Sequence, residues 1–197
     1  MEWLFIDIDE TSARTIEDGV YPIVNLRYGT NFHHDTTFDY RDVFWDVLIE
    51  NWTTVSLQRK IEIFYQAILQ DSEKNCIRPV QWSVEKIRNL SSSYYIGMLS
   101  ARHNELLDYT QKWVYHYYGN SVKKILFSNC YHGWKRRKPD ICKDEWVKIM
   151  IEDDMDYALE LAYEGISVFL LRKPWNIERN EKHKNIIRLN SWDELQL

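Results

Sequence analysis

Short apolar runs alternate with helix-length segments from residue 94 onward, and few folds accommodate this alternation. We predict strands at 94–99, 125–127, 147–151, 166–171 and 186–189, and helices at 104–118 and 155–164. Both helices run into a glycine, Gly119 and Gly165, as helices commonly do because glycine tolerates a left-handed conformation. Strands separated by helices predict a parallel sheet with helices on both faces.

The N-terminal part of the chain follows a different pattern. The apolar run Trp3–Ile8 predicts a first buried strand. The pattern then becomes helical, and apolar residues recur at helical spacing between Leu57 and Ile68. We therefore predict an α/β core of residues 1–12 and 86–197, with residues 13–85 inserted after the first strand as a small helical cap.

Composition narrows the class of protein. Of the 197 residues, 45% are hydrophobic and 28% are charged, which is typical of a globular chain with a sizeable core. The longest apolar runs span about six residues, far short of the roughly 20 that cross a bilayer. A net charge of −5 disfavours a general nucleic-acid binder. The short apolar runs predict no membrane partner. The three widely spaced cysteines match no disulfide framework or zinc site, so we expect a cytoplasmic protein.

Polar or acidic residues follow three of the predicted strands. Asp7 and Asp9 end the first strand, Ser100 follows the strand at 94–99, and Glu152-Asp153-Asp154 follows the strand at 147–151. Sites in parallel sheets lie at the carboxyl ends of the strands. Acids gathered there would repel one another unless a cation joined them, and Mg²⁺ prefers oxygen ligands. The sequence therefore predicts a magnesium site.

The spacing of Asp7 and Asp9 suggests a division of labour. Residues i and i+2 on a strand share a face and lie roughly 6.5 Å apart. One carboxylate can attack a substrate while the other handles a proton, or both can approach one metal ion. The alternative is that each acid is only a turn residue at the end of a strand.

Four segments, taken in order, resemble the signature motifs of one enzyme superfamily. Asp7–Thr11 has the form DxDxT, and Leu99–Arg102 contains a serine at the end of a predicted strand. Lys138–Cys142 supplies a lysine, and Ile149–Asp154 is an acidic motif. Together they resemble the haloacid dehalogenase-like (HAD) superfamily of phosphohydrolases across almost the whole chain. The resemblance implies a Rossmann-like parallel sheet with a helical cap.

Within this superfamily, the chain resembles the cytosolic 5'(3')-deoxyribonucleotidase type of 5'-nucleotidase. The segments that carry this resemblance are Tyr28–Asn31, Ser100–Arg102, Pro174–Asn176 and Ser191–Glu194. It implies a nucleoside monophosphate as the substrate. Glu10 departs from the pattern, because such proteins usually have a glycine there.

The resemblance also implies a mechanism. Asp7 would attack phosphorus and form an aspartyl-phosphate, while Asp9 would protonate the leaving alcohol and then activate water. Mg²⁺ would be held by Asp7, the backbone carbonyl of Asp9, and Asp153, with Asp154 as a further candidate ligand. The acidic pair of this motif is either Glu152-Asp153 or Asp153-Asp154.

The remaining candidates would bind the substrate. Ser100 would donate a hydrogen bond to a phosphate oxygen. Lys138, chosen from the basic run 135–138 because Pro-Asp-Ile-Cys follows it, would neutralise charge on the phosphoryl group and on Asp7. The resemblance implies further substrate contacts at Thr11, Ala101, Arg102 and Asn176.

Two alternatives stay open at this point. A HAD phosphatase could instead act on another metabolite or on a 3' or 5' phosphate end of a nucleic acid, which the basic run 135–138 would favour. A catalytically silent protein could bind a ligand or partner through the same pocket. The sequence also leaves a homodimer open.

Overall fold

A computed structural model describes residues 1–33, 57–74, 76–129 and 136–197. The strands are β1 (Glu2–Ile6), β2 (Tyr94–Ser100), β3 (Val122–Phe127), β4 (Ile149–Glu152), β5 (Ser167–Leu171) and β6 (Ile186–Leu189). The α-helices are α1 (Tyr21–Tyr28), α3 (Leu57–Lys74), α4 (Ser83–Leu90), α5 (Leu107–Tyr118), α6 (Lys138–Asp144) and α7 (Met155–Tyr163). A π-helical segment at Thr15–Val20 and 3-10 turns at Asn104–Leu106, Gly119–Ser121 and Trp192–Glu194 complete the elements.

The six strands form one parallel sheet in the order β3-β2-β1-β4-β5-β6, which confirms the predicted fold class. This is the doubly wound order of Rossmann-like folds. The strand order reverses at β1, which pairs with β2 on one side and with β4 on the other. Ligands bind such sheets outside the carboxyl ends of the strands at this reversal point, so β1, β2 and β4 are where a site is expected.

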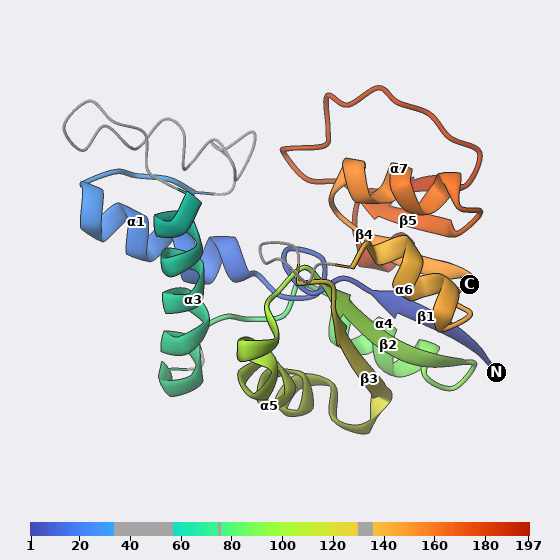
Figure 1. Ribbon diagram of the computed structural model, residues 1–197, viewed down its shortest axis with the longest axis horizontal. Helices are drawn as coiled ribbons and strands as arrows, with labels where there is room; N and C mark the ends of the chain where they lie inside the picture. Colours follow the sequence, from blue (N-terminus) through green and yellow to red (C-terminus); the bar gives the residue numbers. More distant parts are fainter. Residues whose placement is uncertain (34–56, 75, 130–135) are drawn as a thin grey trace. The chain divides into compact units, whose positions relative to one another are not determined.

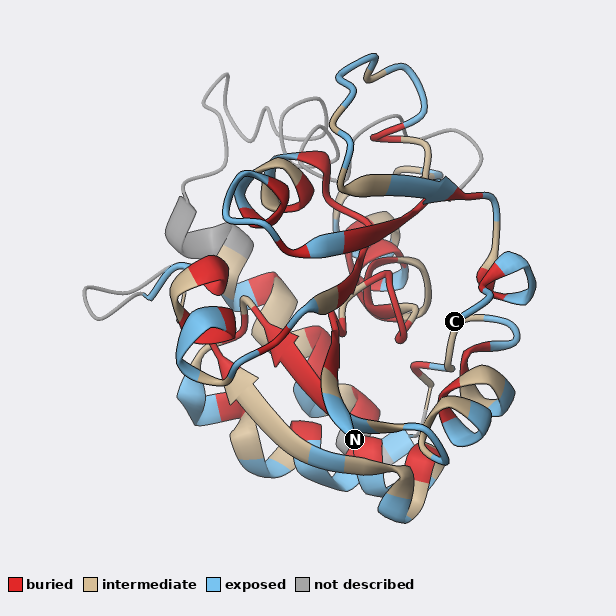
Figure 2. Cartoon of the chain, turned by 90° about the vertical axis from the view of Figure 1, so that its right-hand side faces the viewer, coloured by how far each residue is buried: buried red, intermediate tan, exposed pale blue. Residues whose placement is uncertain are grey.

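Helices cover both faces of the sheet, as Figure 1 shows. Helices α4 and α5 pack against β2 and β3, whereas α6 and α7 contact each other and α7 packs on β4, β5 and β6. Right-handed crossovers produce this arrangement, because the chain moves across the sheet in opposite directions before and after β3. Buried residues concentrate along the central strands (Figure 2).

One glycine in the sheet is required by packing. A Cβ at Gly97 on β2 would lie 2.2 Å from a ring carbon of Phe5, its neighbour on β1. Phe5 is fully buried and belongs to the cluster that α6 and α7 cover. Gly97 therefore makes room for the ring beside the reversal point of the sheet.

Several predicted boundaries differ from the structure. Strand β1 ends at Ile6 rather than Ile8, because the chain turns at Asp7 and Ser12 donates hydrogen bonds back to Asp7 and Ile8. Helix α6 was not predicted, although Pro139 in its first turn is a recognised start signal. Beyond Ser191 the chain forms a 3-10 turn at Trp192–Glu194.

Residues 14–78 form a second compact unit, separate from the sheet unit of residues 1–13 and 79–197. In its described part, α1 and α3 pack on the π-helical segment around buried residues such as Val20, Val24 and Ile63. At the end of the unit, Arg78 pairs with Asp18, and its carbonyl accepts a hydrogen bond from the amide of Arg14 at the start of the unit. Part of the predicted cap lies outside the described residues, and its role as a cap stays a prediction.

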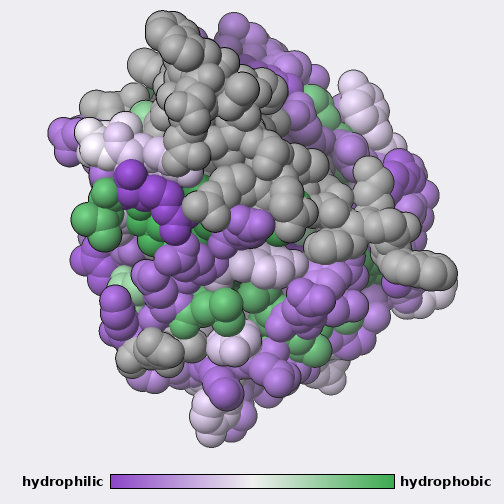
Figure 3. Space-filling view, turned by 60° about the vertical axis from the view of Figure 1, so that its left-hand side comes forward, coloured by the Kyte–Doolittle hydropathy of each residue, from purple (hydrophilic) through white to green (hydrophobic). Residues whose placement is uncertain are grey.

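No helix in the described ranges is both long and apolar enough to cross a membrane. Hydrophilic side chains dominate the described part of the face drawn in Figure 3, with smaller apolar patches between them.

Candidate active site

The loop that follows β1 is held in place by its own backbone and side chains. The amide of Asp7 continues the ladder with β4 by donating to the carbonyl of Ile151 at 2.9 Å. The hydroxyl of Ser12 lies 3.0 Å from the carbonyl oxygen of Asp7, and the amide of Glu10 donates to the carbonyl of Ala13. Glu10 adopts φ 60°, a left-handed conformation that glycine takes more readily than glutamate.

Two side chains of the sheet unit donate hydrogen bonds to the backbone of this loop. Tyr118 at the end of α5 donates from its hydroxyl to the carbonyl of Ser12 at 2.9 Å. The fully buried Trp192 donates from its indole nitrogen to the carbonyl of Thr11 at 2.8 Å. The backbone around Asp7 and Asp9 is therefore fixed by partners distant in sequence.

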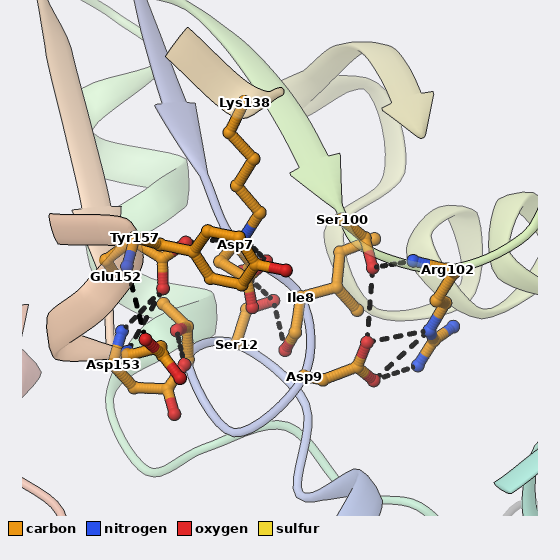
Figure 4. A network of polar contacts seen from close by, with 12 residues as sticks. Asp7, Ile8, Asp9, Ser12, Ser100, Arg102, Lys138, Glu152, Asp153 and Tyr157 are labelled. Atoms are coloured by element: carbon orange, nitrogen blue, oxygen red, sulfur yellow. Dashed lines mark hydrogen bonds and ion pairs between the residues drawn. The ribbon is translucent and has the colours of Figure 1, made fainter. Parts of the chain in front are cut away.

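A buried ionic cluster surrounds Asp7, as Figure 4 shows. The ammonium of Lys138 at the start of α6 donates to Asp7 Oδ1 at 2.6 Å and also pairs with Glu152 at the end of β4. It lies 4.3 Å from the centre of the Tyr157 ring. Burial alone would lower the pKa of Lys138, but the charges of Asp7 and Glu152 raise it well above its usual value. Lys138 is therefore a fixed cation beside Asp7.

Asp153 completes the acidic side of the cluster. Its Oδ1 accepts a hydrogen bond from the Thr11 hydroxyl at 2.7 Å, and its Oδ2 accepts one from the indole of Trp175 at 3.0 Å. The side-chain amide of Asn176 donates to the Asp153 carbonyl at 2.7 Å. Thr11 and Asn176, both fully buried, thus hold Asp153 in place, and their predicted contacts with substrate stay predictions.

The donor set fits a hard divalent cation. Among the described residues, Asp7, Glu152 and Asp153 place carboxylate oxygens within 4.8 Å of one another. Burial raises the pKa of Asp7 and of Asp153 well above the usual value, and repulsion between neighbouring acids adds to this effect. A cation such as Mg²⁺ would favour the ionised carboxylates, and it takes oxygen ligands of this kind.

Asp154 contacts a different partner. Its carboxylate caps α7 by accepting hydrogen bonds from the amides of Asp156 at 2.8 Å and Tyr157 at 3.2 Å. Glu152 in turn accepts from the amides of Asp153 and Asp154. The geometry thus favours Glu152-Asp153 over Asp153-Asp154 as the acidic pair, and a metal-ligand role for Asp154 stays a prediction.

The Asp9 carboxylate contacts residues at and just after the end of β2. It accepts a hydrogen bond from the Ser100 hydroxyl at 3.1 Å and pairs with Arg102, whose Nη2 lies 2.6 Å from Oδ1. The half-buried Ala101 lies between these two residues in the sequence. The structure therefore brings the predicted residues Ser100 and Arg102 to Asp9, and both side chains contact its carboxylate.

Glu10 is buried, and its charge has a partner. The ammonium of Lys173, just after β5, lies 3.9 Å from Glu10 Oε2, with 10% and 3% of the two side chains exposed. Lys173 also counteracts the rise in the pKa of Asp153. Lys173 was not predicted as a site residue, although it immediately precedes the Pro174-Trp175-Asn176 segment that carries the nucleotidase resemblance.

Most of the described basic run is neutralised locally. Arg136 pairs with Asp144, Arg137 pairs with Asp140 at 2.8 Å, and Lys138 is buried against Asp7. Lys135 lies outside the described residues. These pairs weaken the idea that the run binds a nucleic-acid backbone.

Comparison with known proteins identifies the fold. A nucleotidase from Clostridium acetobutylicum is 25% identical over 193 residues, covering 96% of this chain and 89% of the relative. A HAD hydrolase of family IA, variant 3, from Entamoeba histolytica has a TM-score of 0.65 at 12% identity, covering 100% of this chain and 96% of that one. No protein-family model matches the chain.

Further solved structures agree. CbbY from Rhodobacter sphaeroides, solved in complex with phosphate, has a TM-score of 0.61 at 16% identity and covers 98% of this chain and 96% of that one. A haloacid dehalogenase-like hydrolase from Streptococcus pneumoniae has a TM-score of 0.62 at 14% identity, covering 87% and 85%. These likenesses confirm that the predicted resemblance holds at the level of the fold.

Proposed function

We propose that this chain, which has the fold of the HAD-like hydrolases, is a Mg²⁺-dependent phosphate monoester hydrolase that acts on nucleoside monophosphates. The observation that carries the proposal is the buried cluster at the reversal point of the sheet. There Asp7 contacts Lys138 and lies with Glu152 and Asp153 in one group of carboxylates.

Asp7 is the proposed nucleophile. Its backbone is fixed at the end of β1, and its carboxylate contacts Lys138 at 2.6 Å. A carboxylate repels an anionic phosphate, so attack requires positive charge beside both groups. Lys138 supplies this positive charge at its position beside Asp7. The thiol of Cys142, one turn along α6, is no rival nucleophile, because burial raises its pKa to about 12.

The proposed metal ligands are the carboxylates of Asp7 and Asp153 and the backbone carbonyl of Asp9, with Asp154 as a further candidate. When bound, Mg²⁺ would withdraw charge from the phosphoryl oxygens and offset the repulsion between nucleophile and substrate. Thr11 and Trp175 fix the orientation of the Asp153 carboxylate for metal binding, because each donates a hydrogen bond to one of its two oxygens. Glu152 pairs with Lys138 in the same cluster.

Asp9 is the proposed general acid and base. In the first step an oxygen of Asp7 forms a bond to phosphorus, the bond to the leaving oxygen breaks, and Asp9 gives that oxygen its proton. In the second step water attacks the same phosphorus, Asp9 takes a proton from the water, and the bond to Asp7 breaks. The products are an alcohol and inorganic phosphate, and both Asp7 and Asp9 return to their starting states.

A nucleotide is the proposed substrate for two reasons. The relative from Clostridium acetobutylicum is named a nucleotidase and aligns along nearly the whole chain. The segments Tyr28–Asn31 and Pro174–Asn176 also resemble those of deoxyribonucleotidases. We further propose that residues 13–85 act as a cap that selects the substrate.

The test is phosphate release from a panel of nucleoside monophosphates and from p-nitrophenyl phosphate, with Mg²⁺ and with a chelator. We expect release that requires Mg²⁺ and that is fastest with one nucleotide. Release from the aryl ester and from none of the nucleotides would indicate a phosphatase for another metabolite. No release from any ester by folded, metal-loaded protein would refute the proposed hydrolysis and favour a ligand-binding role.

A further inference from the structure

Arg102 is buried directly beside Asp9, with its guanidinium turned onto the carboxylate. Its Nε lies 3.1 Å from both carboxylate oxygens of Asp9, and its Nη2 lies 2.6 Å from Oδ1. Only 4% of Arg102 is exposed. A planar guanidinium that meets a carboxylate through two nitrogens fixes the direction of that carboxylate.

The other end of the guanidinium is anchored in a helix. Arg102 Nη1 donates to the hydroxyl oxygen of Thr110 on α5 at 2.9 Å. That hydroxyl donates its own proton to the carbonyl of Leu106 at 2.8 Å, so its lone pair is directed at Arg102. Thr110 is fully buried. The orientation of Arg102 therefore depends on a rigid element that lies outside the reacting atoms.

Ser100 closes the same arrangement from β2. Its hydroxyl donates to Asp9 Oδ2 at 3.1 Å and accepts a hydrogen bond from the amide of Arg102 at 3.1 Å. Asp9 is thus held from the end of β2 by a hydroxyl and by an ion pair. Figure 4 shows these contacts converging on one carboxylate.

We propose that Arg102 is a positioning residue that aims the Asp9 carboxylate at the leaving group, and that it does not bind the substrate phosphate. The inference rests on the proposed function, in which Asp9 moves the protons. A general acid contributes only while it is held within hydrogen-bond reach of the leaving oxygen. The chain Leu106–Thr110–Arg102–Asp9 supplies that restraint from α5.

The test uses a matched pair at Thr110 and a charge-conserving change at Arg102. Thr110→Val keeps the shape but removes the hydroxyl, Thr110→Ser keeps the hydroxyl, and Arg102→Lys keeps the charge but loses the planar fork. Because loss of alignment at a reacting group costs up to about 100-fold, we expect kcat for a nucleoside monophosphate to fall about 100-fold in Arg102→Lys and about 10-fold in Thr110→Val. Thr110→Ser should restore the wild-type rate, and KM should stay within about twofold throughout.

The leaving group provides a second readout. p-Nitrophenolate departs without needing a proton from Asp9. The rate of its release in the first step should therefore change by less than about threefold in Arg102→Lys and in Thr110→Val. Arg179→Lys, which alters the ion pairs of Arg179 with Asp156 on α7 and with Glu181, is the control for an arginine-to-lysine change outside the site. Thermal unfolding of each variant shows whether a lost rate reflects lost structure.

Binding of inorganic phosphate separates the inference from the proposed function, because it needs no turnover. If Arg102 only positions Asp9, calorimetric titration should give a phosphate Kd that Arg102→Lys changes by less than about threefold. A rise in both this Kd and KM of about tenfold or more, with kcat unchanged, would overturn the inference and make Arg102 a phosphate ligand. Unchanged kcat in Thr110→Val and Arg102→Lys would also overturn it. An inactive wild-type protein would count against the proposed function, whereas the phosphate affinities would still decide the role of Arg102.

Discussion

The two halves of the candidate site differ in how far they are sealed from solvent. Around Asp7, the side chains of Lys138 and Glu152 are each 1% exposed, and that of Asp7 is 7% exposed. Around Asp9, the carboxylate itself is 20% exposed, although Arg102 behind it is buried. The Asp7 half is therefore a buried ionic cluster, whereas the Asp9 half borders the solvent.

The cations of the two halves also differ in the number of carboxylates that they contact. Lys138 is a compact charge that joins carboxylates from two different strands, so it ties the ends of β1 and β4 together. Arg102 grips a single carboxylate through a planar fork. We infer that substitutions in the Asp7 half change stability and activity together, and that substitutions in the Asp9 half change activity more than stability.

The largest effect is expected at Lys138. Lys138→Met should reduce phosphate release by at least about 10³-fold and destabilise the fold by about 3–5 kcal/mol, because it leaves two buried carboxylates unpaired. Denaturant unfolding and initial rates measure the two losses. Lys143→Met on the same helix is the matched control, since its 52% exposed side chain pairs only with Glu164 at the surface in the described contacts. A normal rate in Lys138→Met would refute a role for this lysine.

A smaller effect on stability, with a large effect on rate, is expected at Asp9. Asp9→Asn should lower kcat by about 10²- to 10⁴-fold, the usual contribution of an acid–base group. Its unfolding free energy should fall by about 1–2 kcal/mol, since the amide oxygen can still accept from Arg102 and water can reach the site. A stability loss equal to that of Lys138→Met would remove the distinction between the two halves.

The stabilisation of the fold by bound Mg²⁺ should depend on the carboxylates of the Asp7 half. Saturating Mg²⁺ should raise the thermal midpoint of the wild type, because a ligand present at about 100 times its Kd stabilises the folded state by about 2.7 kcal/mol. Asp153→Asn should abolish most of this shift, and Asp9→Asn should keep it, since the proposed ligand there is the backbone carbonyl. Differential scanning calorimetry with and without Mg²⁺ measures the shift. Equal shifts in the wild type and Asp153→Asn would place the metal elsewhere.

The smallest effect on the rate is expected at Tyr118, which contacts the loop after β1. Tyr118→Phe removes the hydrogen bonds that this hydroxyl makes with the Ser12 carbonyl and the Ser83 hydroxyl. We expect it to cost about 1–2 kcal/mol of unfolding free energy, with a few-fold loss of kcat. Chemical denaturation and steady-state kinetics test both values. A loss of kcat as large as that in Asp9→Asn would mean that the loop, and not its carboxylates, limits the rate.

Much of the fold could be predicted from the sequence because its strands are short apolar runs that end in polar residues. The order of Asp7, Ser100 and Asp153 along the chain, together with parallel topology, was enough to expect them near one edge. The role of Asp154 as a helix cap could have been read from its place directly before α7, since aspartate is a favoured N-cap.

Other partnerships between side chains could not be predicted. The resemblance implied that Lys138 lies beside Asp7, but the pairing of Lys138 with Glu152 depends on how α6 packs on the sheet. The Thr110–Arg102–Asp9 chain likewise depends on the rotation of α5, which periodicity alone does not fix to a single side chain. Lys173 was missed because a lone lysine after a strand resembles a surface charge until its burial is known.

The most direct test of the central claim is to trap the covalent intermediate. Wild-type protein with Mg²⁺ and a radiolabelled phosphate monoester, quenched in acid within milliseconds, should carry a label that hydroxylamine removes and that maps to the peptide containing Asp7. Asp7→Asn should carry none. Phosphate release without any label on the protein, or a label on another residue, would contradict Asp7 as the nucleophile.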